Sequence, residues 1–332
     1  MNDRALPKDR VLLGPVATWF PEQTAEVVTL AELADLPANR REHALALGID
    51  TVRTADGMTE VDLAAEAART ALDEAGLAAA DLDALILATG RAPQYLLASE
   101  ATRLQHRIGA ARAFTTAAGD LGCVSVSAAL TLAASLVRAD AHCRNVLVVS
   151  AAKTPTRNRY RAPMTVLGDG AAALLVTTSG AGRWEFVDQI VRSEGKYADL
   201  FRIDYRDIGS DDWVEECADE SAYSFRLAVE SKKRFDAIIP ELLRRNGVGD
   251  SAVGPILMQN LSAGAFAFWE EALDRPVDKA CRTNLAAYGH LGSMDVLVNL
   301  EAAAASRAPG DYALVLNSSP VAAWSACLLR RV

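Results

Sequence analysis

The chain has 332 residues, and 51% of them are hydrophobic, so it can bury a sizeable core and does not have the composition of a disordered protein. Its formal net charge is −9 and its pI is about 5.1. Because the sequence also contains no long basic run, we expect no nucleic-acid-binding surface.

In the first half of the chain, short apolar runs alternate with Ala-rich and Leu-rich helical patterns. Strands are predicted over residues 11–16, 82–88, 145–151 and 171–177. Helices are predicted over residues 62–75, closed by Gly76, over residues 99–108, ending at Gly109, and over residues 126–138. The segment 114–121 precedes Cys123, which lies just before the start of the third predicted helix.

The second half repeats this rhythm without obvious sequence identity to the first. Helices are predicted over residues 225–246, 263–273 and 295–305, with strands over residues 255–259, 312–317 and 323–330. This alternation predicts an α/β fold with buried sheets. The natural seam is Ser-Gly-Ala-Gly-Arg-Trp at residues 179–184, so we divide the chain into halves 1–178 and 179–332. Residues 194–219 are highly charged, and we expect a long surface excursion that covers a pocket.

Five scattered cysteines, none in a Cys-x-x-Cys pair, predict neither a disulfide framework nor a zinc site. Residues 1–15 contain charged side chains and no apolar stretch of signal-peptide length. No run was expected to be long enough to cross a membrane. We therefore expect a cytoplasmic protein without a metal or other cofactor and without a membrane partner.

Five segments, in their order and spacing, resemble the ketoacyl-ACP synthase III family. They are Leu47-Gly48-Ile49 with Arg53, residues 92–109, Asp120-Leu121-Gly122-Cys123 with residues 127–130, Leu167-Gly168-Asp169-Gly170-Ala171, and Trp324-Ser325-Ala326. The resemblance extends from about Arg10 to Val332. It implies a thiolase-like fold with two pseudo-repeats in a layered αβαβα arrangement, a homodimer, and an acyl-CoA or acyl-carrier-protein donor.

Cys123 is the predicted nucleophile. It follows a glycine and precedes a predicted helix, whose free N–H groups and dipole favour the thiolate form of a cysteine. A thiolate attacks a thioester readily and stores the acyl group as another thioester. The alternative is a small buried apolar cysteine, and the family resemblance favours the nucleophile.

At two positions the sequence departs from the carbon–carbon-bond-forming members of this family, whose site is completed by a His and an Asn. Gln259 stands where the resemblance places the His, followed by Asn260, and His290 stands at the Asn position. The family's His and Asn stabilise an enolate through hydrogen bonds. A histidine beside a cysteine nucleophile is better suited to take a proton from an attacking hydroxyl or amine.

The segment Gly289-His290-Leu291-Gly292-Ser293-Met294-Asp295 is similar to a Gly-His-x-Gly-x-x-Asp pattern in one subgroup of the family. That subgroup includes a ketosynthase homolog that forms malonyl esters in cervimycin biosynthesis and starter-unit enzymes of anthracycline pathways. The resemblance implies a triad of Cys123, His290 and Asp295, with the carboxylate holding the imidazole tautomer. A loop histidine and an ordinary helix-start acid are the alternatives.

Four further residues are predicted to contact substrate: Gln259, Asn260, Arg161 and Ser319. Arg161 matches a family position near the donor's phosphates. The family's second oxyanion donor comes from a Gly-rich loop before the last strand. Here that loop reads Ser318-Ser319-Pro320-Val321, and Pro320 has no N–H group.

These observations favour an acyltransferase that passes an acyl group from a thioester donor through Cys123 to the hydroxyl or amine of a small natural-product acceptor. One alternative is a decarboxylating synthase that forms a carbon–carbon bond. Another is a catalytically silent partner subunit, although the intact Cys123 argues against silence.

Overall fold

The first half of the chain folds into the alternating strands and helices that its apolar runs predict. The computed structural model describes residues 10–90, 92–180, 182–209, 212–321 and 323–332. Residues 1–9, which belong to the segment without a predicted signal peptide, lie outside the described residues. The elements are β1 (Val11–Leu13), β2 (Ala17–Trp19), β3 (Thr24–Glu26), η1 (Val27–Thr29), α1 (Ala31–Ala34), α2 (Ala38–Leu45), β4 (Thr51–Arg53), α3 (Glu60–Ala75), η2 (Ala79–Asp81), β5 (Ala84–Ala88), α4 (Glu100–Ile108), β6 (Phe114–Ala118), η3 (Gly122–Val124), α5 (Ser125–Ala139), β7 (Asn145–Ala152), β8 (Tyr160–Arg161), β9 (Thr165–Val166) and β10 (Gly170–Thr177).

The second half begins with a strand that the sequence pattern did not predict, β11 (Trp184–Ser193). It continues with η4 (Gly195–Tyr197), β12 (Phe201–Arg202), β13 (Glu216–Cys217), the π-helical turn η6 (Ala222–Leu227), α6 (Ala228–Arg245), η7 (Asp250–Ala252), α7 (Ala263–Leu273), α8 (Lys279–Tyr288), η8 (Gly292–Met294), α9 (Asp295–Ala304), β14 (Tyr312–Ser319) and β15 (Ala323–Arg331). The predicted strand at residues 255–259 is reduced to isolated bridges at Ile256 and Leu257.

The predicted helix ends are confirmed, because local side chains satisfy their free backbone groups. Thr59 and Asp62 form a reciprocal capping box at the start of α3, and Gly76 ends that helix in the left-handed region with φ 62°. At the start of α4 the Ser99 hydroxyl accepts from the Thr102 N–H, and Gly109 ends that helix with φ 80°.

The strands of the two halves pair in the same pattern. In the first half, β1 pairs antiparallel with β10, and β10 pairs antiparallel with β7. Next, β7 pairs parallel with β5, and β5 pairs parallel with β6. In the second half, β11 pairs antiparallel with β15 and β15 with β14, and parallel bridges then join Leu257 to β14 and Ile256 to Val277. Pairing of β1 with β11 joins the halves into one sheet.

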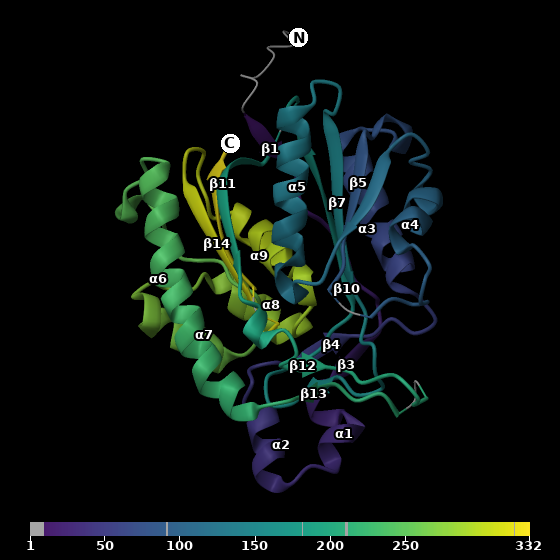
Figure 1. The fold of residues 1–332 in the computed structure, drawn as a ribbon, viewed down its shortest axis with the longest axis vertical. Helices are drawn as coiled ribbons and strands as arrows, with labels where there is room; N and C mark the ends of the chain where they lie inside the picture. The colour runs from purple at the N-terminus through teal and green to yellow at the C-terminus, as the bar shows by residue number, and fades with distance from the viewer. Residues whose placement is uncertain (1–9, 91, 181, 210–211, 322) are drawn as a thin grey trace.

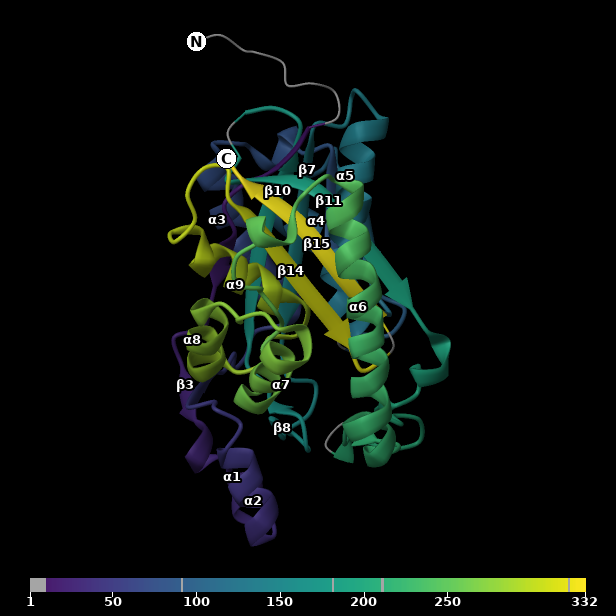
Figure 2. The same cartoon turned by 90° about the vertical axis from the view of Figure 1, so that its left-hand side faces the viewer.

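Helices cover both halves of this sheet and fill the space between them. Figure 1 shows α5 and α9 in the middle, with α3 and α4 on one side and α6 and α7 on the other. Figure 2 shows α6 running along β14 and β15, and α6 packs directly on β15. The arrangement is the predicted α/β, thiolase-like layering, and it brings the starts of α5 and α9 together.

The run Gly122–Ala139 does reach the length and hydropathy of a membrane span, contrary to the expectation from the sequence. Its 18 residues have a mean hydropathy of 1.5, and 56% of them are buried. These residues form η3 and α5, which pack between the two halves of the sheet. A helix covered on two sides becomes apolar around most of its circumference, which explains the composition without a membrane.

Candidate active site

Cys123 lies at the turn that connects β6 to the central helix α5. Gly122, with φ 53°, starts the η3 turn, and Cys123 is only 5% exposed. The first N–H groups of such a helical run have no partner within the helix, so they face the thiol with a partial positive charge. Asn317 on β14 fixes the turn from the other half of the chain, because its Nδ2 donates to the Cys123 carbonyl at 2.7 Å.

His290 lies directly against this cysteine. Its Nε2 atom is 3.3 Å from Cys123 Sγ, and its Nδ1 atom is 2.5 Å from Asp295 Oδ2. His290 is carried by the loop between α8 and η8, and Asp295 is the first residue of α9. The structure therefore brings the three predicted triad residues together.

Asp295 is held in place by backbone donors on both of its oxygens. The Leu291 N–H donates to Oδ1 at 2.8 Å, and the Asn260 N–H donates to Oδ2 at 2.9 Å. The carboxylate is fully buried, and so is nearly all of His290. Burial of a carboxylate is tolerable when its lone pairs are satisfied in this way. The imidazole is thereby fixed in orientation.

The surroundings of His290 favour its charged form. Burial alone would lower its pKa, but the Asp295 carboxylate and Cys123 raise the pKa of His290 to about 9. At neutral pH the imidazole is therefore protonated, with one N–H toward Asp295 and the other toward the sulfur. An imidazolium beside a cysteine favours the thiolate, which is the nucleophilic form.

The nucleophile and the acid are carried by equivalent turns in the two halves, in which Cys123 corresponds to Ser293 and Asp295 to Ser125. Leu121-Gly122-Cys123-Val124-Ser125 opens α5, and Leu291-Gly292-Ser293-Met294-Asp295 opens α9. Both turns start with a left-handed glycine, φ 53° at Gly122 and φ 65° at Gly292. This correspondence lies behind the shared rhythm of the halves, although only Leu and Gly are identical between the two segments.

The backbone of the His290 loop rests on the predicted Gly168-Asp169-Gly170 turn. The His290 N–H donates to the Val166 carbonyl at 2.9 Å, and the Gly168 N–H donates back to the His290 carbonyl at 3.1 Å. A Cβ atom at Gly168 would clash with the Tyr288 carbonyl. A glycine is therefore required for this close approach.

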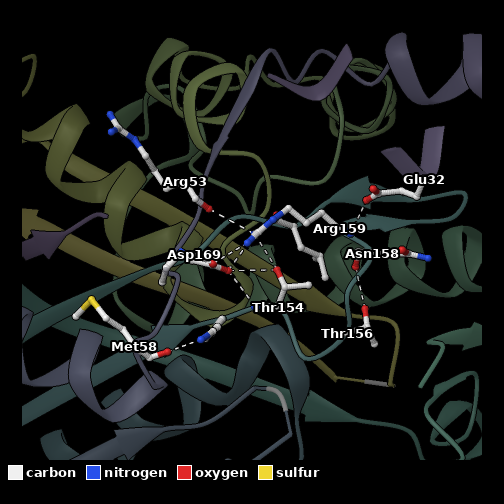
Figure 3. A network of polar contacts seen from close by, with 11 residues as sticks. Glu32, Arg53, Met58, Thr154, Thr156, Asn158, Arg159 and Asp169 are labelled. Carbon is white, nitrogen blue, oxygen red and sulfur yellow. Dashed lines mark hydrogen bonds and ion pairs between the residues drawn. The ribbon is translucent and has the colours of Figure 1, made fainter. Parts of the chain in front are cut away.

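Asp169 anchors that turn through a buried ion pair with Arg159, as Figure 3 shows. Arg159 Nη2 donates to Asp169 Oδ2 at 2.9 Å, and the backbone N–H groups of Ala55 and Thr154 donate to the same carboxylate at 2.8 and 2.9 Å. Burial alone would raise the pKa of Asp169, but the hydrogen bonds and charge of Arg159 hold it below 3.8. These contacts fix the Gly168-Asp169-Gly170 turn, which holds the backbone of His290.

A cavity of about 580 Å³ opens onto Cys123 and His290. One wall comes from the loop near Pro93 and Leu96 and from the hairpin after β14. Another part of the lining comes from the excursion after β11, through Phe201, Tyr205 and Trp213. The prediction that this excursion covers a pocket is confirmed. The volume suits a small-molecule substrate.

Arg161 and Ser319 lie on the cavity wall. The Arg161 guanidinium forms a two-point ion pair with Glu215 of the excursion, with N–O distances of 2.7 and 2.6 Å. The charge of Arg161 is thus balanced within the chain. The same ion pair connects the excursion to the Arg161 part of the cavity lining. Ser319 is the last residue of β14 and is 2% exposed.

Gln259 and Asn260 are not among the residues that line the cavity, and their contact with substrate stays a prediction. The Gln259 amide turns toward β14, donating to the Ser318 hydroxyl at 2.5 Å and accepting from the Ser318 N–H at 3.3 Å. Asn260 is fully buried, and its Oδ1 accepts from Asn299 at 2.8 Å. Its backbone N–H donates to Asp295 and so supports the carboxylate.

Several supporting polar residues were not predicted. Asn317 and Ser150 lie in otherwise apolar strands, and Ser150 pairs with Ser293 at 2.7 Å between the Oγ atoms. Asn299, inside the apolar helix α9, also donates to the Met258 carbonyl at 2.6 Å. A polar residue at a buried position of an apolar element needs a hydrogen-bond partner. Such an isolated polar residue in an apolar run is the sequence signal by which these supporting residues could have been found.

The chain resembles known proteins over most of its length. Residues 120–195 match the model of the 3-oxoacyl-[acyl-carrier-protein (ACP)] synthase III family. A β-ketoacyl-[acyl-carrier-protein] synthase III from Oleidesulfovibrio alaskensis is 30% identical over 294 residues, which cover 83% of this chain and 86% of that protein. The chain belongs to the synthase III family. As a synthase III family member, it is an acyl-transferring enzyme.

Two solved structures share the fold of this chain. ChlB3, described as an acyltransferase, superposes with a TM-score of 0.82 at 22% identity, covering 97% of this chain and 98% of that one. AbyA1, a tetronic acid condensing enzyme, superposes with a TM-score of 0.80 at 23% identity, covering 96% and 99%. At these identities the likeness concerns the fold.

Proposed function

We propose that this synthase III family member is an acyltransferase that forms esters or amides on a small natural-product acceptor. The donor is an acyl thioester of coenzyme A or of an acyl carrier protein. One observation carries the proposal: the Cys123–His290–Asp295 chain of contacts, with 3.3 Å from sulfur to imidazole and 2.5 Å from imidazole to carboxylate.

In the first half-reaction, the Cys123 thiolate adds to the carbonyl carbon of the donor thioester. The donor thiolate then leaves and takes the Nε2 proton of His290. Loss of the charge on sulfur removes one of the two groups that raise the pKa of His290. The imidazole is therefore left neutral beside the acyl-enzyme, with its remaining N–H held by Asp295.

In the second half-reaction, the acceptor hydroxyl or amine attacks the acyl group on Cys123, and its proton passes to His290 Nε2. The bond between carbon and sulfur breaks, and the thiolate is released beside a newly formed imidazolium. The resting ion pair is restored. The imidazole thus acts first as an acid and then as a base, as in other nucleophile–histidine–acid sites.

The competing proposal is a decarboxylating synthase that forms a carbon–carbon bond. The names of its sequence relatives favour this reaction. The orientation of Gln259 argues against it, because its amide donor is engaged with Ser318. Decarboxylation needs donors aimed at the thioester carbonyl of the malonyl group, where the enolate charge develops.

Carbon dioxide release distinguishes the two reactions. The enzyme is given malonyl thioesters labelled with ¹³C at the free carboxyl, together with a panel of hydroxyl and amine acceptors. An acyltransferase transfers the label to an ester or amide product. Stoichiometric loss of labelled carbon dioxide with a carbon–carbon product would instead establish the synthase reaction.

We also propose that the protein is a homodimer joined at the β6 edge of the sheet. Among the described residues, β6 pairs only with β5, so its outer edge has unpaired backbone groups. Phe114 on β6 is 61% exposed, and Tyr95 and Leu96 expose further apolar surface. Light scattering coupled to size-exclusion chromatography should report twice the chain mass.

A further inference from the structure

The hairpin between β14 and β15 raises a question about how the site stabilises a developing oxyanion. Addition of a thiolate to a thioester places negative charge on the carbonyl oxygen, which two or more fixed donors ordinarily stabilise. The N–H of Cys123, in the first turn of η3 and α5, supplies one. Pro320 in the facing hairpin has no N–H to supply another.

The next amide of the hairpin is also engaged. The Val321 N–H donates to the Ser319 hydroxyl oxygen at 3.3 Å. That contact uses an acceptor site of the hydroxyl and leaves its proton to point elsewhere. Among the described residues, it is the only hydrogen bond of the Ser319 side chain.

Ser319 lies where such a donor is needed. It is on the cavity wall together with Cys123 and His290. A Cβ atom added to Gly122 would clash with Ser319 Oγ, so the hydroxyl packs directly against the residue that precedes the nucleophile. The Gly122 peptide unit carries the Cys123 N–H group.

We propose that the Ser319 hydroxyl is the second oxyanion donor and acts with the Cys123 amide in both half-reactions. The hydroxyl donates a hydrogen bond to the oxygen of each tetrahedral intermediate and transfers no proton. The Val321 N–H orients it by occupying its lone pair. The inference rests on the proposed acylation of Cys123, the step that the two candidate functions share.

Ser319→Ala tests this role through the rate of acyl loading. Loss of one oxyanion donor typically lowers the rate about 10²–10³-fold. Loading of the full chain from an acyl-CoA, followed by rapid quenching and intact-protein mass spectrometry, should therefore slow about a hundredfold. Alkylation of Cys123 by iodoacetamide, which forms no oxyanion, should keep its wild-type rate.

Two further variants separate chemistry from folding. Ser325→Ala removes another buried hydroxyl, which pairs with Ser127 at 2.8 Å and is not on the cavity wall, and it should load at the wild-type rate. Pro320→Gly restores a backbone N–H beside the lost hydroxyl. Combined with Ser319→Ala, it should recover loading at least tenfold over Ser319→Ala alone.

Equal slowing of loading and alkylation in Ser319→Ala would overturn the inference, since it would show damage to the nucleophile itself. So would wild-type loading by Ser319→Ala, and that result would leave the proposed function intact. A wild-type enzyme that alkylates normally but accepts no acyl group from any thioester would overturn the proposed function as well.

Discussion

Asp295 Oδ2 lies 2.5 Å from His290 Nδ1, on the side of the imidazole opposite Cys123. The carboxylate thereby fixes which nitrogen faces the sulfur. Asp295→Asn keeps the size of the side chain, but its NH₂ group favours the wrong tautomer. General-base catalysis contributes about 10²–10⁴-fold, so His290→Ala and Asp295→Asn should each transfer the acyl group at least about a hundredfold more slowly.

Single-turnover measurements that follow loading and transfer separately check this prediction. Loading should suffer less than transfer in both variants. The double variant should be little worse than His290→Ala, because residues that act as one unit have non-additive effects. Transfer at the wild-type rate in both single variants would refute the role of His290 as the base.

The raised pKa of His290 predicts an unusual pH profile for Cys123 alkylation. Because that pKa is about 9, the imidazolium is present at lower pH and is lost as the pH rises through 9. Iodoacetamide should therefore react faster with wild-type Cys123 than with Cys123 of His290→Ala at lower pH, and this advantage should shrink as the pH rises through 9. At pH 6.5 the alkylation rate of His290→Ala should be about tenfold or more below that of wild type.

Cys123 should carry the acyl group alone among the five cysteines. Burial raises the pKa of Cys143 and of Cys217, that of Cys281 to about 12, and that of Cys327, which disfavours the thiolate form of all four. Intact-protein mass spectrometry with candidate acyl thioesters should show one stable adduct. The adduct should be absent from Cys123→Ala, and its persistence there would move the nucleophile elsewhere.

The buried pair of Asp169 and Arg159 should make the protein sensitive to acid. A carboxylate whose pKa is lowered in the folded state contributes stability above its unfolded pKa, here about 3.8, and the contribution is lost as the pH falls through the lowered value. Asp169→Asn should lower the free energy of unfolding at pH 7 by about 3–5 kcal/mol, because it leaves a largely buried guanidinium unpaired.

Urea unfolding at pH 7 and pH 3 measures both effects. The difference in stability between the two pH values should be smaller in Asp169→Asn than in wild type. Asp236→Asn, which removes an exposed partner of Lys232, is the matched control and should change stability by at most about 1 kcal/mol. Equal pH dependence in wild type and Asp169→Asn would contradict the prediction.

The sequence predicted the elements that have strong local signals. The capping residues of α3 and α4 and the apolar runs of β5, β7 and β10 determine those elements almost alone. The strand β11 was missed because its alternation is broken between Phe186 and Asp188, where the register with β15 shifts. A bulge depends on the partner strand and cannot be read from one segment.

The site was predictable where a motif fixes both residue type and backbone position. Cys123, His290 and Asp295 each lie at a glycine-marked turn before a helix. Gln259 and Asn260 were predicted to contact substrate, but the direction of an amide depends on distant partners, here Ser318 and Asn299. Sequence spacing carries no information about those partners.

The matching turns at Gly122 and Gly292 distribute the chemistry between two segments that are made at different times. During synthesis, the thiol emerges from the ribosome more than 160 residues before the imidazole that activates it, since 167 positions separate them. An incomplete chain therefore presents the cysteine without the imidazolium that favours its thiolate form. Only the complete fold holds thiol, imidazole and carboxylate in contact.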